Sequence, residues 1–147
     1  MKKTVLITGI LIFNALAMFA QKSEVFNPSN GAIHGYDPVA YFKESKPVKG
    51  DPKLSLSWKG ASWNFSNQQN LDAFKSSPET YAPQYGGYCA YGLTKGKKVP
   101  ASPDAWAISN GKLYLNYDKD VQAKWKENQK ENIEIANSKW PTVKNQE

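Results

Sequence analysis

Two side chains suited to chemistry occur only once in this sequence of 147 residues, Cys89 and His34. Cys89 lies in the segment YAPQYGGYCAYG (81–92), among four tyrosines and three glycines. A thiol in such a place is a metal ligand, a nucleophile or a small buried residue. Each role makes a different demand on the residues around it.

A metal site is the first of these roles. Soft metals need at least two or three thiolate, thioether or imidazole ligands. Both methionines, Met1 and Met18, lie in the N-terminal apolar segment, so Cys89, His34 and Asp37 are the mixed cluster that the rest of the chain offers. Copper or zinc would suit it. The alternative is that Cys89 is simply buried and that His34 is a solvated loop residue.

A catalytic site is the second role. Cys89 would be the attacking thiolate, His34 the base and Asp37 the group that orients the base, which requires side chains far apart in the sequence to meet. The pair Gly86-Gly87 would leave backbone N–H groups free to hold an oxyanion, or would only let the chain turn and pack tightly. A thiol enzyme is therefore an alternative rather than the main expectation.

A third interpretation needs no reactive group. Tyrosines gather on expected loops and element ends: Tyr36, Tyr41, Tyr81, Tyr85, Tyr88 and Tyr91. A hydroxyl on an apolar ring suits a pocket for a small molecule or a partner segment, although core packing accounts for part of the group. We expect a site where the turn at 35–38 meets the loop at 86–89. Its ligand-binding residues would be Tyr36, Asp37, Tyr85, Tyr88 and Cys89, unless Asp37 only caps a turn.

The first twenty residues, MKKTVLITGILIFNALAMFA, have the pattern of a secretory signal peptide. Two lysines precede an uncharged apolar run that is shorter than the roughly 20 residues needed to span a bilayer. We expect cleavage after Ala20 or Ala17, export to the periplasm or the medium, and no transmembrane anchor afterwards. The alternative is an uncleaved membrane anchor. No cysteine follows either cleavage point, which disfavours a lipoprotein.

The composition of the mature chain limits its partners. Without Lys2 and Lys3 it has 17 basic residues, all lysine, against 13 acidic ones. The absence of arginine and the scatter of the lysines argue against a reader of phosphate or nucleic acid. About 127 residues fit one domain, and a single cysteine forms no internal disulfide. We expect a small molecule, a metal ion or an envelope protein as partner.

Short patterned segments position these residues in the first half. Residues 39–42 follow an Asp-Pro turn and are expected to form a short strand. Apolar and polar residues alternate on both sides of Lys59-Gly60 in the segment 54–65, which predicts a hairpin with one buried face. Ser66 or Asn67 then caps a helix, and Ser77-Pro78 begins a second short helix that ends near Pro83.

The second half begins with a glycine-rich loop region at 84–98. Asn110-Gly111 supplies a tight turn within AWAISNGKLYLNY (105–117), which predicts a second hairpin. Asp118 caps a long helix to about Lys139, before Pro141. The hairpins and helices do not alternate strictly along the chain, which predicts an α+β domain. Its small antiparallel sheet would be built from the hairpins, and the short helices and the long C-terminal helix would pack on that sheet.

Three stretches together resemble the exported single-domain branch of the YHS domain family: AIHGYDPVAYF (32–42), WKGASWNFSNQQNLDAFKSSPETYAPQYGGYCAYG (58–92) and NGKLYLNYDKDVQAKW (110–125). The shared pattern is Gly-Tyr-Asp-Pro-Val-Ala-Tyr-Phe, a Gly-aromatic-Phe hairpin, a Phe helix, Pro-x-x-Tyr and Gly-Gly-x-Cys-Ala. The resemblance covers a YHS-like domain at 32–143, and with the residue pattern of the N-terminal part it divides the chain into a signal peptide (1–20), a lead-in segment (21–31), this domain and a tail (144–147).

The resemblance implies a small fold and, for the wider family, association with copper or other heavy metals, often as an appendage of transport or oxygenase proteins. Metal-linked relatives carry cysteines where this chain has Ala40, Ser66 and Asn70. We therefore expect an exported, non-catalytic YHS-like domain that binds a small ligand or a metal ion. A thiol-dependent enzyme or redox protein using Cys89 and a protein-interaction module of the cell envelope are the alternatives.

Overall fold

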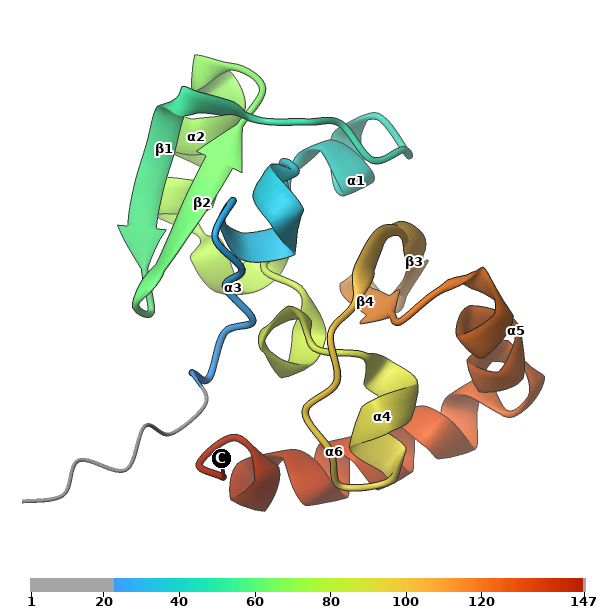
Figure 1. Cartoon of the computed structure of the whole chain (residues 1–147). Helices are drawn as coiled ribbons and strands as arrows, with labels where there is room; N and C mark the ends of the chain where they lie inside the picture. The colour runs from blue at the N-terminus through green and yellow to red at the C-terminus, as the bar shows by residue number, and fades with distance from the viewer. Residues whose placement is uncertain (1–22, 147) are drawn as a thin grey trace, which may run out of the picture.

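The computed structural model describes residues 23–146, which fold as an α+β domain (Figure 1). The first half contains the short turn η1 (Ala32–Gly35), α1 (Ala40–Lys43), β1 (Asp51–Trp58), β2 (Ala61–Phe65), α2 (Gln68–Ser76) and α3 (Pro78–Tyr81). The second half contains the turn η2 (Gln84–Gly87), α4 (Ala90–Thr94), β3 (Ser102–Ser109), β4 (Lys112–Asn116), α5 (Lys119–Glu127) and α6 (Gln129–Val143). The expected signal peptide lies outside the described residues.

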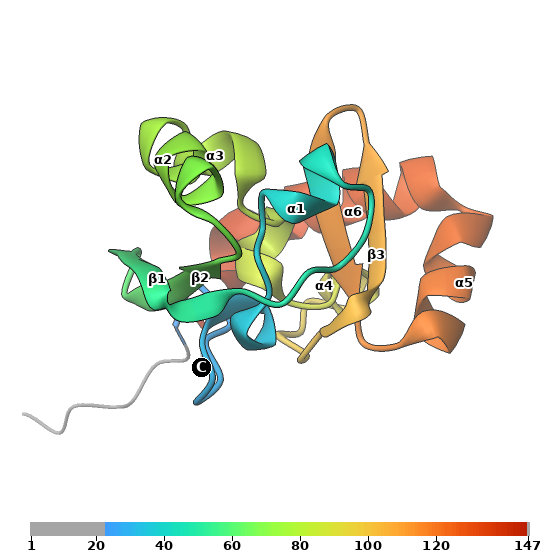
Figure 2. The same ribbon diagram turned by 90° about the horizontal axis from the view of Figure 1, so that it is seen from above.

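The two hairpins pair as separate two-stranded antiparallel sheets, β1-β2 and β3-β4. Figure 2 shows them apart, with α2 and α3 beside the first hairpin and α5 beside the second. Both turns have two residues with positive φ, Lys59-Gly60 and Asn110-Gly111. This geometry matches the twist of the flanking strands and explains why both hairpins were predictable. The α+β class is confirmed.

Strand β4 lies between two apolar clusters. Leu113 and Leu115 pack with Trp63, Phe65 and the rest of the first cluster. Tyr114, which points to the other face, packs with the second cluster beside Trp125. Because successive side chains of a strand point in opposite directions, one short strand joins the two halves of the core.

Three element predictions differ from the structure. Residues 39–42 lie in the helical turn α1 rather than a strand, because the backbone N–H groups of Val39 and Ala40 are capped by Asp37. The region 84–98 contains a short helix, α4. The single long helix is divided at Asn128, whose extended φ of −133° ends α5, and α6 continues past Pro141 in its last turn.

The described part of the lead-in segment, residues 23–31, packs on the domain. Val25 is buried, and the backbone N–H of Phe26 donates to the carbonyl of Gly86 at 2.9 Å. The hydroxyl of Tyr88 donates to the carbonyl of Ser23 at 2.7 Å. A Cβ atom on Gly86, whose φ is +62°, would lie 1.8 Å from the carbonyl oxygen of Glu24. The close approach of the two backbones therefore requires glycine at this position.

Within residues 23–146, none of the helices combines the length and the apolar character that crossing a bilayer requires.

Candidate functional site

Asp37 is completely buried, and its carboxylate is saturated by hydrogen bonds within the protein. Oδ1 accepts from the backbone N–H groups of Val39 and Ala40 at 2.8 and 3.3 Å. Oδ2 accepts from the N–H and the hydroxyl of Ser66, both at 2.8 Å, and from the side-chain amide of Asn70 at 2.7 Å. The carboxylate thus joins α1 to the start of α2.

The three positions that the sequence resemblance singles out for metal-linked cysteines, Ala40, Ser66 and Asn70, all lie around this carboxylate. Here they supply N–H and O–H donors, and none of them brings a thiolate. A soft metal needs thiolate, thioether or imidazole ligands. This part of the chain is therefore suited to a hydrogen-bonded joint and does not fit copper or zinc.

Cys89 is the N-cap of α4 and is only 2% exposed. Its sulfur accepts from the backbone N–H groups of Gly92 at 3.4 Å and Tyr117 at 3.3 Å. Burial raises the pKa of the thiol, and the N–H donors, including those of Gly92 and Tyr117, oppose that rise. A nucleophilic cysteine needs an accessible sulfur with a lowered pKa. Cys89 meets neither condition, because its sulfur is buried and the pKa of its thiol is raised.

Asn116 is the partner of Cys89 that sequence reasoning missed. The thiol donates to its Oδ1 at 3.6 Å, and the backbone N–H of Tyr91 donates to the same oxygen at 3.0 Å. Asn116 is completely buried at the end of β4. Within the described residues its Nδ2 atom has no hydrogen-bond partner. The contact links α4 to the second hairpin, and no local sequence pattern signals it.

His34 lies in a different setting from Cys89. Its backbone has a φ of +50°, and its ring forms a T-shaped contact with the ring of Phe26, with the centroids 5.5 Å apart. With Tyr36, His34 lines an open polar groove of about 440 Å³ that also includes Lys49 and Asp104. This groove includes neither Cys89 nor Asp37 among its walls.

The predicted metal cluster does not form. In the described range 23–146, no three His, Cys, Asp or Glu side chains are grouped so that they could hold a metal ion. Cys89, His34 and Asp37 are therefore not brought together as ligands. The physical reason is that Asp37 and Cys89 each complete a separate hydrogen-bond network at a helix start.

The two remaining predicted ligand residues, Tyr85 and Tyr88, lie in the second apolar cluster. The hydroxyl of Tyr85 donates to Oδ1 of Asn137 at 2.8 Å, which fixes the ring against α6. Burial raises the pKa of both hydroxyl groups. Tyr88 holds the lead-in segment, whereas Tyr85 lines a cavity.

This aromatic cavity has a volume of about 110 Å³. It lies between the lead-in segment, the β1–β2 turn, the segment after α3, and α6. Polar atoms supply most of its exposed surface, and the apolar and aromatic residues that line it include Val25, Trp58, Trp63, Ala82, Tyr85 and Trp140. The indole N–H of Trp63 donates to the carbonyl of Trp58 at 3.0 Å, so the polar atom of that ring is satisfied within the wall.

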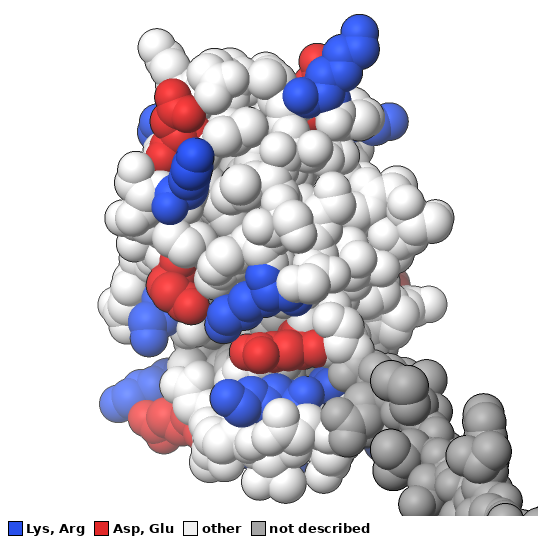
Figure 3. Space-filling view, turned by 90° about the vertical axis from the view of Figure 1, so that its left-hand side faces the viewer, with Lys and Arg blue, Asp and Glu red and all other residues white. Residues whose placement is uncertain are grey.

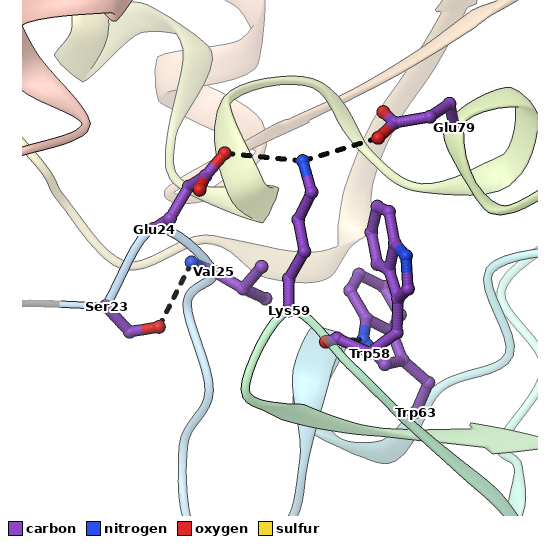
Figure 4. A network of polar contacts seen from close by, with 7 residues as sticks. All are labelled: Ser23, Glu24, Val25, Trp58, Lys59, Trp63 and Glu79. Atoms are coloured by element: carbon purple, nitrogen blue, oxygen red, sulfur yellow. Dashed lines mark hydrogen bonds and ion pairs between the residues drawn. The ribbon is translucent and has the colours of Figure 1, made fainter.

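Charged groups stand at the edge of the aromatic cavity. Figure 4 shows the ammonium of Lys59 between the carboxylates of Glu24 and Glu79, with 3.4 Å from Nζ to Oε1 in each pair. The same ammonium lies 4.9 Å from the centroid of a Trp58 ring. Burial lowers the pKa of Lys59, but the two carboxylates outweigh burial and raise it overall. Lysine and acidic side chains are also neighbours across the surface of this face of the molecule (Figure 3).

Comparison of the chain with protein-family models, curated proteins and solved structures finds no significant match.

The residues around the aromatic cavity were only partly predictable. The sequence predicts Tyr85 at a ligand site, and it predicts Trp58 and Trp63 within a hairpin that has one buried face. Lys59 was predicted only as a turn residue, and nothing in the local sequence indicates that Glu24 and Glu79 approach it from 35 and 20 positions away. The aromatic content was the available signal, since buried tryptophan and tyrosine rings commonly line ligand pockets.

Proposed function

We propose that this chain is an exported, non-catalytic YHS-like domain that binds a small ligand in the aromatic cavity. The observation that supports this most is the lining, in which buried rings of Trp63 and Tyr85 face a hollow bordered by charged groups. Ligand sites place a few fixed polar groups beside aromatic rings, and in this cavity polar atoms supply most of the exposed lining. The assignment to the YHS family rests on the three stretches of sequence that resemble it.

The volume of the aromatic cavity limits the size of the ligand. A cavity of about 150 Å³ holds one benzene molecule, and this one has about 110 Å³. The enclosed part of the ligand therefore has about four or five non-hydrogen atoms, and any further atoms would extend to the open side. A drug-sized molecule would not be enclosed.

A binding role without catalysis agrees with the state of the two candidate reactive groups. The Cys89 thiol is buried, with its pKa raised by burial, and it is held by backbone N–H groups and Asn116. The Asp37 carboxylate accepts five hydrogen bonds that maintain the fold. Neither group lines the aromatic cavity.

The test is a binding measurement on the mature protein, residues 21–147. The indole N–H signals of Trp63 and Trp140 would be followed by two-dimensional NMR during titration with phenol, imidazole and choline at millimolar concentrations. We expect at least one probe to shift both signals saturably. If no probe shifts them, the proposal fails.

A cavity-filling variant locates the binding. Ala82→Leu places three further carbon atoms in the cavity wall and should abolish the shifts, while a urea titration checks that the fold remains. Ala123→Leu makes the same change on the exposed face of α5 and should bind like the parent protein. Equal binding by both variants would place the probe elsewhere and overturn the assignment of the cavity.

A further inference from the structure

The Lys59 ammonium occupies a place with the features of a site for a positive charge. It is flanked by two carboxylates, from the lead-in segment and from α3, and it lies over the ring of Trp58. Tryptophan rings attract cations through their negative faces, and aromatic walls are the usual site for ammonium ligands that carry methyl groups. The protein thus fills this place with a cation of its own.

The charge of this group favours a further cation. Glu24, Glu79 and Lys59 together carry a formal charge of −1, and Lys59 is the one basic residue among the described residues that line the cavity. The apolar rings of Trp63, Tyr85 and Trp140 lie in the same cavity. A ligand that combines a positive charge with an apolar surface would match both parts of the wall, whereas an anion would meet two carboxylates.

Lys59 is held in a way that allows displacement. Its side chain is 37% exposed, and those of Glu24 and Glu79 are 41% and 77% exposed. Ion pairs this open to water are weak, because solvent screens them and the long side chains lose entropy in forming them. Lys59 also projects from a two-residue hairpin turn, so its side chain can move outward without disturbing the strands.

Building on the proposed function, we infer that the aromatic cavity takes a small organic cation, an alkylated ammonium group, and that Lys59 occupies the place of this cation in the free protein. The alkyl groups contact the indole and phenol rings, and the positive charge lies toward Glu24 and Glu79. Lys59 is then an internal competitor, which leaves when the ligand enters. Its removal should increase affinity.

The experiment compares choline with 3,3-dimethylbutan-1-ol, a neutral molecule of the same shape. Binding to the mature protein would be measured from the Trp63 and Trp140 indole signals. We expect choline to bind at least about threefold more tightly than the alcohol. Added salt should weaken the binding of choline but not the binding of the alcohol. Equal affinities would overturn the cation inference and leave the proposed function intact. If neither molecule binds but phenol or imidazole does, only the inference fails.

Variants test the part played by each charge. Lys59→Asn, which tolerates the positive φ of this position, should bind choline about three- to tenfold more tightly. Lys53→Asn, on the strand β1 that leads into this turn, should leave the affinity unchanged. The double variant Glu24→Gln/Glu79→Gln should lose the preference for choline over the alcohol. An unchanged or weaker affinity in Lys59→Asn would show that Lys59 does not compete and would overturn the inference.

Discussion

The side-chain amide of Asn70 donates a 2.7 Å hydrogen bond to the carboxylate of Asp37, which lies 33 positions earlier in the chain. Both residues are buried. Because the same carboxylate also accepts from Ser66 and from the start of α1, it connects two segments that are distant in sequence, 37–40 and 66–70. Asp37 thereby has a structural role that its place before Pro38 only partly indicates.

Replacement of Asp37 by asparagine should strongly destabilise the fold. The variant loses the negative charge and turns one acceptor into a donor that faces other donors, which leaves buried N–H groups unpaired. We expect the free energy of unfolding, measured by urea titration, to fall by about 3 kcal/mol. Asp51→Asn, at an exposed carboxylate, should change it by less than about 0.5 kcal/mol. Equal effects would contradict the structural role of Asp37.

Substitution of Gly86 by alanine should release the lead-in segment. The new Cβ atom would lie 1.8 Å from the Glu24 carbonyl, so the backbones must separate. We expect a loss of more than about 2 kcal/mol in the free energy of unfolding, together with faster deuterium exchange at the Phe26 amide.

Gly96→Ala is the matched control for this substitution. Gly96 has a φ of +70°, close to the +62° of Gly86, but nothing lies within 4 Å of its Cβ position. The free energy of unfolding of Gly96→Ala should therefore fall only by the cost of placing alanine in the left-handed region, about 1 kcal/mol. A similar loss in both variants would mean that contact with the lead-in segment contributes little.

Alkaline solution should destabilise the protein through its buried tyrosines. Burial raises the pKa of Tyr41 and of Tyr85, so the folded protein keeps protons that the unfolded chain releases near pH 10. This contribution to stability is complete below pH 10 and decreases above it, by up to about 1.4 kcal/mol per pH unit for each tyrosine.

Urea titrations between pH 8 and 11 measure this dependence. Above pH 10, the free energy of unfolding of Tyr41→Phe should decrease less steeply than that of the parent protein, because the substitution removes one ionising group from the unfolded chain. Tyr117→Phe, at an exposed position, provides the comparison for a ring without this burial. A free energy of unfolding that stays constant up to pH 11 would refute the prediction.

The Cys89 thiol should react with alkylating reagents mainly through unfolding. Its sulfur is buried and its pKa is raised by burial, so both access and the thiolate fraction are low. We expect labelling of the folded protein to be at least about 100-fold slower than labelling in denaturing urea. Rapid labelling of the folded protein below pH 7 would instead support the thiol-enzyme alternative.

Local sequence was sufficient for most elements of the fold. Each hairpin follows from a glycine at the second position of its turn, Gly60 or Gly111, flanked by alternating apolar positions. The start of α2 follows from Asn67, whose side chain accepts from the Asn70 backbone, and the start of α5 follows from Asp118 in the same way. These features involve residues within a few positions of one another, which a sequence pattern can represent.

The site depended on contacts that no local pattern represents. The sequence by itself determined an α+β domain with one thiol, one imidazole and many aromatic rings. Only the tertiary structure decided that Asp37 and Cys89 complete separate hydrogen-bond networks, and that Lys59 meets Glu24 and Glu79 beside an aromatic cavity. The physical reason is that these side chains are brought together by how the two hairpins and α6 pack, and that packing is set by burial of the whole core rather than by any one segment.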